Sequence, residues 1–120
     1  IPGASLQGWK KYFINSKIYG ADIDKNILFK EDRIKTYYCN QTKPIEIITL
    51  FDSLNIQFDI IVEDGLHTFD ANIIFLNNAI HYLKKGGYYI IEDVQPKDDS
   101  LWKSTIPKLK KTYNLLTYIF

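Results

Sequence analysis

The sequence has no methionine, one cysteine, six glycines and four prolines among its 120 residues. The single cysteine, Cys39, excludes an intrachain disulfide framework and fits a reducing compartment, so we expect a cytoplasmic protein. So few glycines and prolines exclude a collagenous or low-complexity chain, and a hydrophobic content of 46% excludes intrinsic disorder. The absence of methionine leads us to expect that the sequence is a cropped or processed piece.

The chain also lacks an excess of charge of either sign and lacks long apolar runs. Fifteen basic and fourteen acidic residues leave a formal net charge of +1, which argues against a dedicated nucleic-acid binder. No apolar run approaches the roughly 20 residues that a helix needs to cross a bilayer, and we expect no signal peptide from the first residues. We therefore expect one domain over residues 1–120, with neither nucleic acid nor a membrane span.

Helical and strand patterns alternate along the sequence. Apolar spacing predicts four helices, over 4–14, from Pro44 to about 54, over 69–83 and over 100–111. Thr68 is expected to cap the third helix, and Pro107 is expected to interrupt the fourth. Residues 26–32 are at most a short helix. Apolar and β-branched runs predict strands over 17–23, 34–39, 58–62, 88–91 and 114–120. Gly86 is expected to end the third helix in a left-handed conformation. This alternation predicts an α/β domain with a mostly parallel sheet.

Polar side chains follow four of the predicted strands. They are Asp22 with Asp24, Asn40 with Gln41, Glu63 and Asp64 with His67, and Glu92 with Asp93. Ligands of open parallel sheets bind outside the carboxyl ends of the strands, so we expect these groups to line one site.

Three of these acids, Asp64, Glu92 and Asp93, predict a cation site if they converge. Two carboxylates about 4 Å apart repel by roughly 4 kcal/mol at an effective dielectric constant of 20. Three cannot all stay ionised unless a cation joins them or a pKa rises strongly. Oxygen ligands without cysteine favour a hard ion such as Mg²⁺. The alternative is that these acids are solvated turn residues and helix N-terminal charges.

The remaining polar groups each allow two interpretations. An acid at the position of Asp22 can accept hydrogen bonds from both ribose hydroxyls of a nucleotide, whereas Asp24 is expected to cap the next turn. Asn40 can bind an adenine edge or simply form a turn. His67 can take a proton from a substrate hydroxyl or serve a structural role, while His81 is taken as structural. A cluster of lysines is interpreted as a solvated helix face rather than a phosphate site: Lys103, Lys108, Lys110 and Lys111.

Several segments together resemble a known enzyme family. They are Gly3-Ala4-Ser5-Leu6 with Trp9 and Tyr12-Phe13, the run from Ile18 to Asp24, the run from Phe58 through Glu63-Asp64-Gly65 to His67, and Gly86-Gly87 through Ile91-Glu92-Asp93. Over residues 3–93 the sequence resembles class I S-adenosylmethionine-dependent methyltransferases. More closely, it is similar to the metal-dependent sugar O-methyltransferases typified by the macrocin and mycinamicin enzymes. The resemblance implies a Rossmann-like sheet with flanking helices.

The resemblance also implies a role for each candidate residue. At the cofactor, Gly3, Ala4 and Ser5 would surround the methionine moiety, Asp22 would bind the ribose, and Asn40 or Gln41 would lie near the adenine. The Mg²⁺ ion would be held by Asp64, Glu92 and Asp93, and Asp64 would also lie at the cofactor. His67 would be the general base. The implied reaction is methyl transfer from S-adenosylmethionine to a hydroxyl of a sugar or glycan acceptor. Whether the enzyme forms a homo-oligomer is left open.

Two other functions stay open on the sequence alone. One is a Mg²⁺-dependent phosphoryl-transfer domain, which also places acids at the ends of parallel strands. The other is a nucleotide-binding module of the same fold without activity, because a fold does not fix a function.

The resemblance further implies that two strands of the family's sheet lie outside this sequence. One is the central strand between residues 17–23 and 58–63, and the other would follow Phe120. Without the central strand its neighbours would stand about 9–10 Å apart, twice the usual spacing of about 4.8 Å, with unpaired backbone groups between them.

Overall fold

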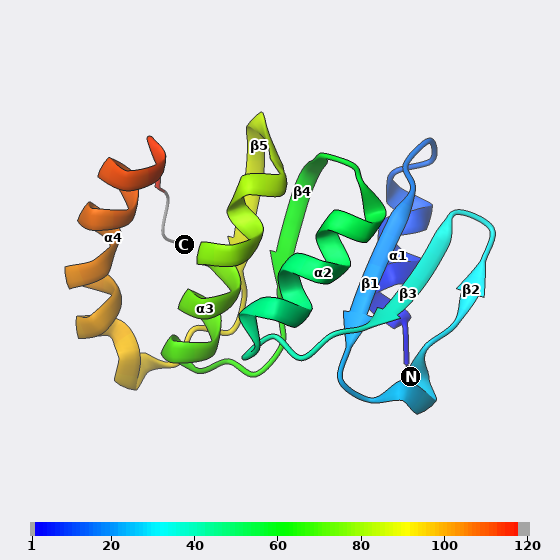
Figure 1. Ribbon diagram of the computed structural model, residues 1–120, viewed down its shortest axis with the longest axis horizontal. Coiled ribbons are helices and arrows are strands. Elements are labelled where there is room, and N and C mark those ends of the chain that lie inside the picture. Colours follow the sequence, from blue (N-terminus) through cyan, green and yellow to red (C-terminus); the bar gives the residue numbers. More distant parts are fainter. Residues whose placement is uncertain (1, 118–120) are drawn as a thin grey trace.

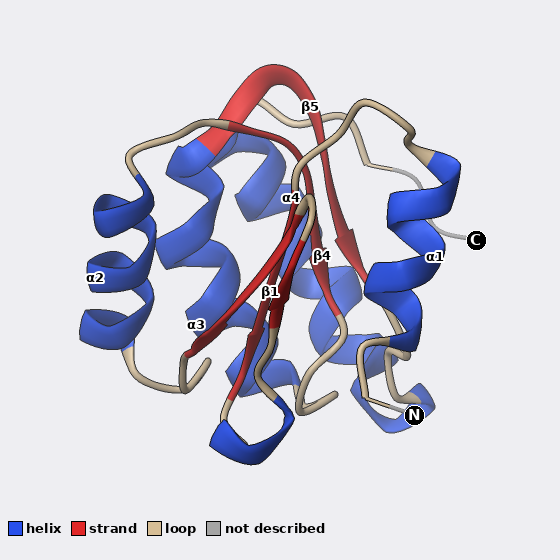
Figure 2. Cartoon of the chain, turned by 90° about the vertical axis from the view of Figure 1, so that its right-hand side faces the viewer, coloured by secondary structure: helices blue, strands red, loops and turns tan. Residues whose placement is uncertain are grey.

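The strands lie edge-on between helices on both faces, with α1 on one side and α2 and α3 on the other (Figure 2). This arrangement comes from a computed structural model, which describes residues 2–117. The helices are α1 (Ala4–Tyr12), α2 (Pro44–Leu54), α3 (Phe69–Ala79) and α4 (Asp99–Tyr113), with short 3₁₀ turns η1 (Lys25–Ile27), η2 (Ile80–Tyr82) and η3 (Pro96–Asp98). The strands are β1 (Ile18–Asp22), β2 (Lys30–Glu31), β3 (Ile34–Tyr38), β4 (Phe58–Glu63) and β5 (Leu83–Ile91).

The strands form two sheets rather than one. In the first sheet β1 pairs with β3 in parallel and β2 pairs with β3 in antiparallel orientation; in the second, β4 and β5 are parallel. Among residues 2–117, β1 and β4 are not hydrogen-bonded neighbours, although they run side by side in the same direction (Figure 1). The rings of Tyr19 and Phe58 meet across this junction at 5.6 Å. The α/β class and the mostly parallel pairing are thus confirmed, and β2 is the antiparallel exception.

The main core lies between β4, β5 and the helices α2 and α3. Its buried members come from α2, β4, α3 and the loop after β3: Cys39, Ile47, Phe51, Ile61 and Ala79. Phe51 packs its ring on Phe58 at 5.4 Å and on Tyr82 at 4.8 Å. Burying an aliphatic or aromatic side chain of this size contributes about 1.5–3 kcal/mol, so this core fixes β4 and β5 against α2 and α3.

The third predicted helix is shorter than expected. α3 ends at Ala79, and residues from Leu83 onward belong to β5. Gly86 does have a left-handed φ of 81°, but it lies within this strand and does not end the helix. Leu83 pairs with Phe58 at the start of β4, and an ideal Cβ on Gly87 would lie 2.7 Å from the carbonyl oxygen of Asp59. Strand pairing with β4 therefore takes these residues away from the helix.

Three other expectations need correction. Pro107 does not interrupt α4, which continues through it to Tyr113. Contacts with α3 hold both halves of α4, because Trp102 packs on Phe69 at 4.9 Å and the hydroxyl of Tyr113 donates to Asn77 at 2.7 Å. Residues 26–32 contain β2 as well as a 3₁₀ turn. The strand expected over 114–120 is absent from residues 114–117, and its remainder lies outside the described residues.

No described helix combines the length and the apolar character needed to cross a bilayer.

Candidate active site

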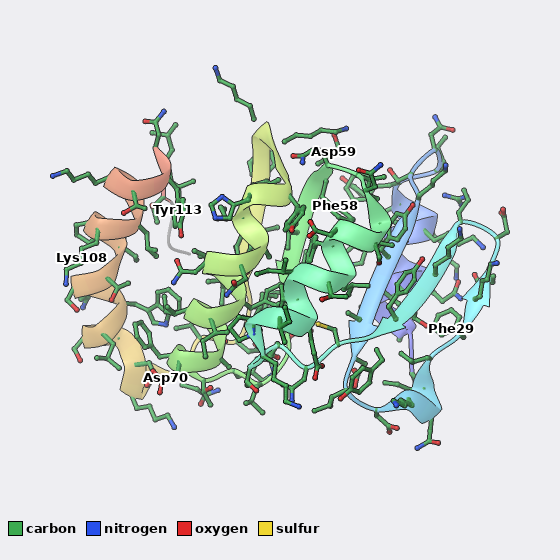
Figure 3. All side chains as sticks on the ribbon, in the orientation of Figure 1. Phe29, Phe58, Asp59, Asp70, Lys108 and Tyr113 are labelled. Atoms are coloured by element: carbon green, nitrogen blue, oxygen red, sulfur yellow. The ribbon has the colours of Figure 1, made fainter. Side chains whose placement is uncertain are left out.

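The carboxyl ends of β1, β3, β4 and β5 point toward one edge of the molecule, the lower edge in Figure 1. The side-chain view locates this edge, because Asp70 at the start of α3 lies there whereas Asp59, at the start of β4, lies at the opposite end (Figure 3). Parallel strands bring their carboxyl ends together in this way. The polar residues that follow the strands therefore share this edge, as predicted.

Asp64, His67 and Asp93 form a group at this edge. Asp64 and His67 come from the loop after β4, and Asp93 follows β5. Each side chain offers one ligand atom, and these atoms all lie within 4.8 Å of one another. The Asp64 Oδ1 atom is 3.9 Å from the Nε2 atom of His67, which is too long for a hydrogen bond. Two carboxylates and an imidazole so close together suit a divalent cation that accepts oxygen and nitrogen ligands.

Two members of this group have unusual backbone conformations. His67 has a φ of 55° and Asp93 a φ of 51°, both in the left-handed region. For residues with a Cβ this region costs roughly 1–2 kcal/mol. Such conformations persist where surrounding structure imposes them, and they gather at functional sites. Both residues of the group therefore adopt a backbone conformation that is uncommon for residues with a Cβ.

Glu92, the other predicted metal ligand, is not in this group. Its backbone N–H donates to the carbonyl oxygen of Glu63 at 2.9 Å, so Glu92 continues the strand ladder. β5 ends at Ile91, and the left-handed backbone at Asp93 turns the chain directly after Glu92. The structure thus brings Asp64 and Asp93 together with His67 as the third member, and a ligand role for Glu92 stays a prediction.

Asp22 and Asp24 lie where β1 ends. The Oδ1 atom of Asp22 accepts a hydrogen bond from the backbone N–H of Asp24 at 2.8 Å. Asp24 caps the 3₁₀ turn η1 by accepting from the N–H of Asn26 at 2.9 Å, which confirms its expected role. This hydrogen bond fixes the Oδ1 atom of Asp22 at the edge of the sheet. The second carboxylate oxygen of Asp22 can then accept a hydrogen bond from a hydroxyl group. The ribose role of Asp22 stays a prediction.

The two residues predicted near the adenine, Asn40 and Gln41, make internal hydrogen bonds. Asn40 Oδ1 accepts from the backbone N–H and the hydroxyl of Thr42, at 3.0 and 2.7 Å, which is the turn role that the sequence left open. Gln41 donates to Glu63 and accepts from the backbone N–H of Leu66, both at 2.8 Å. Its amide is therefore directed at the loop after β4, an engagement that no local sequence signal indicates.

Gly3, Ala4 and Ser5 lie at the N-terminus of α1. Gly3 is the N-cap residue with a left-handed φ of 77°, and an ideal Cβ there would lie 2.6 Å from the ring of Phe29. Ala4 and Ser5 form the first turn and are exposed. Backbone N–H groups of a first helical turn have no partner inside the helix and suit a negatively polarised group. The cofactor role of this segment stays a prediction.

The histidine and lysine expectations have separate outcomes. The Nδ1 atom of His67 is buried without a hydrogen-bond partner among the described residues. His81 is exposed and packs edge-on against Tyr113, with ring centroids 5.8 Å apart. The lysines of α4 are all exposed, as expected for a solvated helix face: Lys103, Lys108, Lys110 and Lys111.

Comparisons with known proteins agree on one group of enzymes. The chain is 32% identical over 93 residues to 8-demethyl-8-alpha-L-rhamnosyl tetracenomycin-C 2'-O-methyltransferase of Streptomyces olivaceus, covering 78% of this chain and 24% of that enzyme. It is 33% identical over 92 residues to demethylmacrocin O-methyltransferase of Streptomyces fradiae, covering 77% and 23% of the two chains. The chain is a homologue of sugar O-methyltransferases of the macrocin and mycinamicin type. It spans about a quarter of the length of these relatives, and no protein-family model matches it.

Solved structures give the same result for the fold. The chain superposes on the MycE methyltransferase of the mycinamycin biosynthetic pathway, solved with Mg and SAH, with a TM-score of 0.82 and 25% sequence identity. That match covers 98% of this chain and 38% of the MycE chain. A second MycE structure, with Mg, SAH and mycinamycin VI, gives a TM-score of 0.75. The Rossmann-like methyltransferase fold expected from the sequence is thereby confirmed.

Proposed function

We propose that this homologue is part of a metal-dependent O-methyltransferase, which transfers the methyl group of S-adenosylmethionine to a hydroxyl of a sugar in a glycosylated precursor. The observation that carries the proposal is the group Asp64, His67 and Asp93, whose ligand atoms lie within 4.8 Å at the tips of two adjacent parallel strands. By its name, the Streptomyces olivaceus relative is a 2'-O-methyltransferase of a rhamnosyl tetracenomycin, and MycE was solved with Mg and SAH. Both facts support the same chemistry here.

The donor set fits a divalent ion such as Mg²⁺ or Mn²⁺. Asp64 and Asp93 supply hard oxygen ligands, and Glu92 follows β5 directly before Asp93, where it can supply another in the role predicted for it. A divalent ion held here would polarise an acceptor hydroxyl and make it easier to deprotonate. In this proposal Asp64 and Asp93 hold the ion, and His67, which lies beside them, takes the hydroxyl proton as general base.

The cofactor would lie along the same edge of the strands. In this proposal Asp22 accepts hydrogen bonds from the ribose hydroxyls, and the first turn of α1 at Gly3, Ala4 and Ser5 lies at the methionine end. Holding the acceptor oxygen and the methyl group in attack geometry is worth up to about 7–11 kcal/mol in well-oriented systems. Asn40 and Gln41 keep their predicted place near the adenine as part of the loop after β3.

The proposal extends to the organisation and location of the protein. We treat residues 1–120 as one S-adenosylmethionine-binding domain, because the core of α2, α3, β4 and β5 supports the same edge that carries the site. A cytoplasmic location is supported by Cys39, a buried free thiol.

The test is a titration of the purified protein with S-adenosylmethionine, followed by methyl transfer to a macrolide that carries a deoxysugar with a free hydroxyl. We expect saturable cofactor binding, and methyl transfer that stops with EDTA and returns with Mg²⁺. Cofactor binding without turnover on any glycosylated acceptor would favour a non-catalytic module. Phosphate release from an activated phosphate ester would favour phosphoryl transfer instead.

A further inference from the structure

Gln41 bridges two loops at the edge of the site. Its Nε2 atom donates to the Oε1 atom of Glu63 at 2.8 Å, and its own Oε1 atom accepts from the backbone N–H of Leu66 at 2.8 Å. Gln41 belongs to the loop after β3, whereas Glu63 is the last residue of β4 and Leu66 lies in the loop that follows, with Asp64 between them. One amide group thus spans the segment that carries the first candidate metal ligand.

Glu63 anchors this bridge from inside the protein. Glu63 is only 4% exposed, so its carboxylate depends on hydrogen-bond donors from the protein. Gln41 and the backbone N–H of Gly65, at 3.2 Å, both donate to Oε1. Asn72, 1% exposed on α3, has its amide oriented so that the nitrogen donates to Oε2 of Glu63 and to the carbonyl oxygen of Thr68, both at 2.9 Å. The loop is therefore tied at both of its ends to one buried carboxylate.

This network encloses the residues of the candidate site. Asp64 and His67 lie between the tied positions, and His67 has the left-handed φ of 55°. The backbone N–H of Glu92 donates to the carbonyl oxygen of Glu63 at 2.9 Å, which connects the same anchor to the segment that carries Asp93. Glu63 therefore forms hydrogen bonds both with the loop that carries Asp64 and His67 and with the segment that carries Asp93.

We propose that Gln41 is a positioning residue that holds the loop after β4 in the conformation that presents Asp64 to a metal ion with His67 beside it. The proposal rests on the metal-dependent function above and assigns Gln41 a role other than direct contact with the cofactor. Groups that orient metal ligands from outside typically change metal affinity by 10- to 100-fold when they are removed.

Gly65 gives the proposal a sharp internal check. An ideal Cβ on Gly65 would overlap the Oε1 atom of Gln41 and lie 2.8 Å from its Cδ atom. Gly65 is not among the residues with a left-handed φ, so its backbone would accept alanine. Alanine at this position must therefore displace the Gln41 amide from both of its hydrogen bonds. Gly65→Ala should then reproduce the effect of Gln41→Ala through the same lost contact.

The experiment measures Mn²⁺ affinity of the purified protein by electron paramagnetic resonance for four variants: Gln41→Ala, Gly65→Ala, the double variant, and Gln57→Ala as a matched control. Gln57 is exposed and precedes β4 at the opposite end of the strand. We expect each single variant to bind Mn²⁺ at least 10-fold more weakly, and the double variant to match either single variant within about twofold. The control should bind like the wild type.

Two results would overturn the proposal. One is wild-type Mn²⁺ affinity in a folded Gln41→Ala protein. The other is a double variant whose loss is the product of the single losses, because the two residues would then act independently.

A metal-free readout separates this proposal from the proposed function. Amide hydrogen exchange of Leu66, measured at a temperature where both proteins are folded, should be at least 10-fold faster in Gln41→Ala than in the wild type. Equal exchange in both proteins would refute the bridge whatever the metal does. The wild type could instead bind no Mn²⁺ while the exchange difference is found as expected. This result would refute the metal-dependent function, and it would contradict the positioning role because Gln41 would then only support the loop.

Discussion

Replacing Asp93 with asparagine should stabilise the metal-free protein and weaken its response to Mg²⁺. The ligand atoms of Asp64 and Asp93 lie within 4.8 Å of one another, and both residues are exposed. At that separation two unit charges repel by about 0.9 kcal/mol at the dielectric constant of water. Asn removes this repulsion, and it tolerates the left-handed backbone that Asp93 adopts at a φ of 51°. The free energy of unfolding should thus rise by up to about 0.9 kcal/mol at low ionic strength.

The sign of the effect reverses when metal is present. An ion that binds only the folded state stabilises it by about 2.7 kcal/mol at 100 times its dissociation constant, and Asp93→Asn should lose most of this gain. Urea unfolding at low salt, with EDTA and then with Mg²⁺, measures both quantities, and Asp32→Asn on an exposed turn is the matched control. A variant that is no more stable than the wild type in EDTA, or that gains as much from Mg²⁺, would refute the reasoning.

Three further predictions follow from single residues. His67→Ala should lower turnover by about 10²–10⁴ while the dissociation constant for S-adenosylmethionine stays within about twofold, and an equal loss in both would contradict a role as general base. The hydroxyl of Tyr89 is buried without a partner among the described residues, and burial followed by the charge of Glu63 raises its pKa. Tyr89→Phe should therefore raise the free energy of unfolding by about 1 kcal/mol, and a loss of stability would reveal a missed partner. Burial, and to a lesser degree the charge of Glu46, raises the pKa of the Cys39 thiol to about 11. The unfolded chain therefore loses the thiol proton at a lower pH than the folded chain does, so the free energy of unfolding should fall as the pH rises from about 9 to 11. Urea unfolding at each pH measures this, and the free energy of unfolding of Cys39→Ala should fall less steeply over the same range.

The sequence was most informative where local pattern and tertiary structure agree. The apolar run Phe58 to Val62 predicted β4, and the acids after it placed Asp64 at the edge of the sheet. Thr68 caps α3 as expected, with its hydroxyl accepting from the N–H of Ala71 at 3.4 Å. Each of these features depends on residues only a few positions apart, which is why a single sequence reveals them.

Contacts between distant residues decided what the sequence did not reveal. Gly86 carries the signature of a helix end, yet pairing of Leu83 with Phe58 extends β5 through it. Pro107 has the chemistry of a helix breaker, but the packing of Trp102 on Phe69 holds α4 across it. These partners are separated by more than twenty positions in the sequence, so local propensity could not predict the outcome.

The candidate site shows the same limit. The sequence predicted Asp64, Glu92 and Asp93 as the metal ligands, whereas the group in the structure is Asp64, His67 and Asp93. No local pattern indicates the left-handed backbone at His67 and Asp93. It also gave no reason for Gln41 to reach Glu63, since these residues are 22 positions apart.

The most direct test of the account is the number of Mn²⁺ ions that the purified protein binds, measured by electron paramagnetic resonance at saturation. Asp64, His67 and Asp93 predict one ion per chain in the wild type, and none at the same free concentration when Asp64 and Asp93 are both changed to asparagine. A wild type that binds no ion, or a double variant that still binds one, would contradict the claim that these strand tips form a metal site.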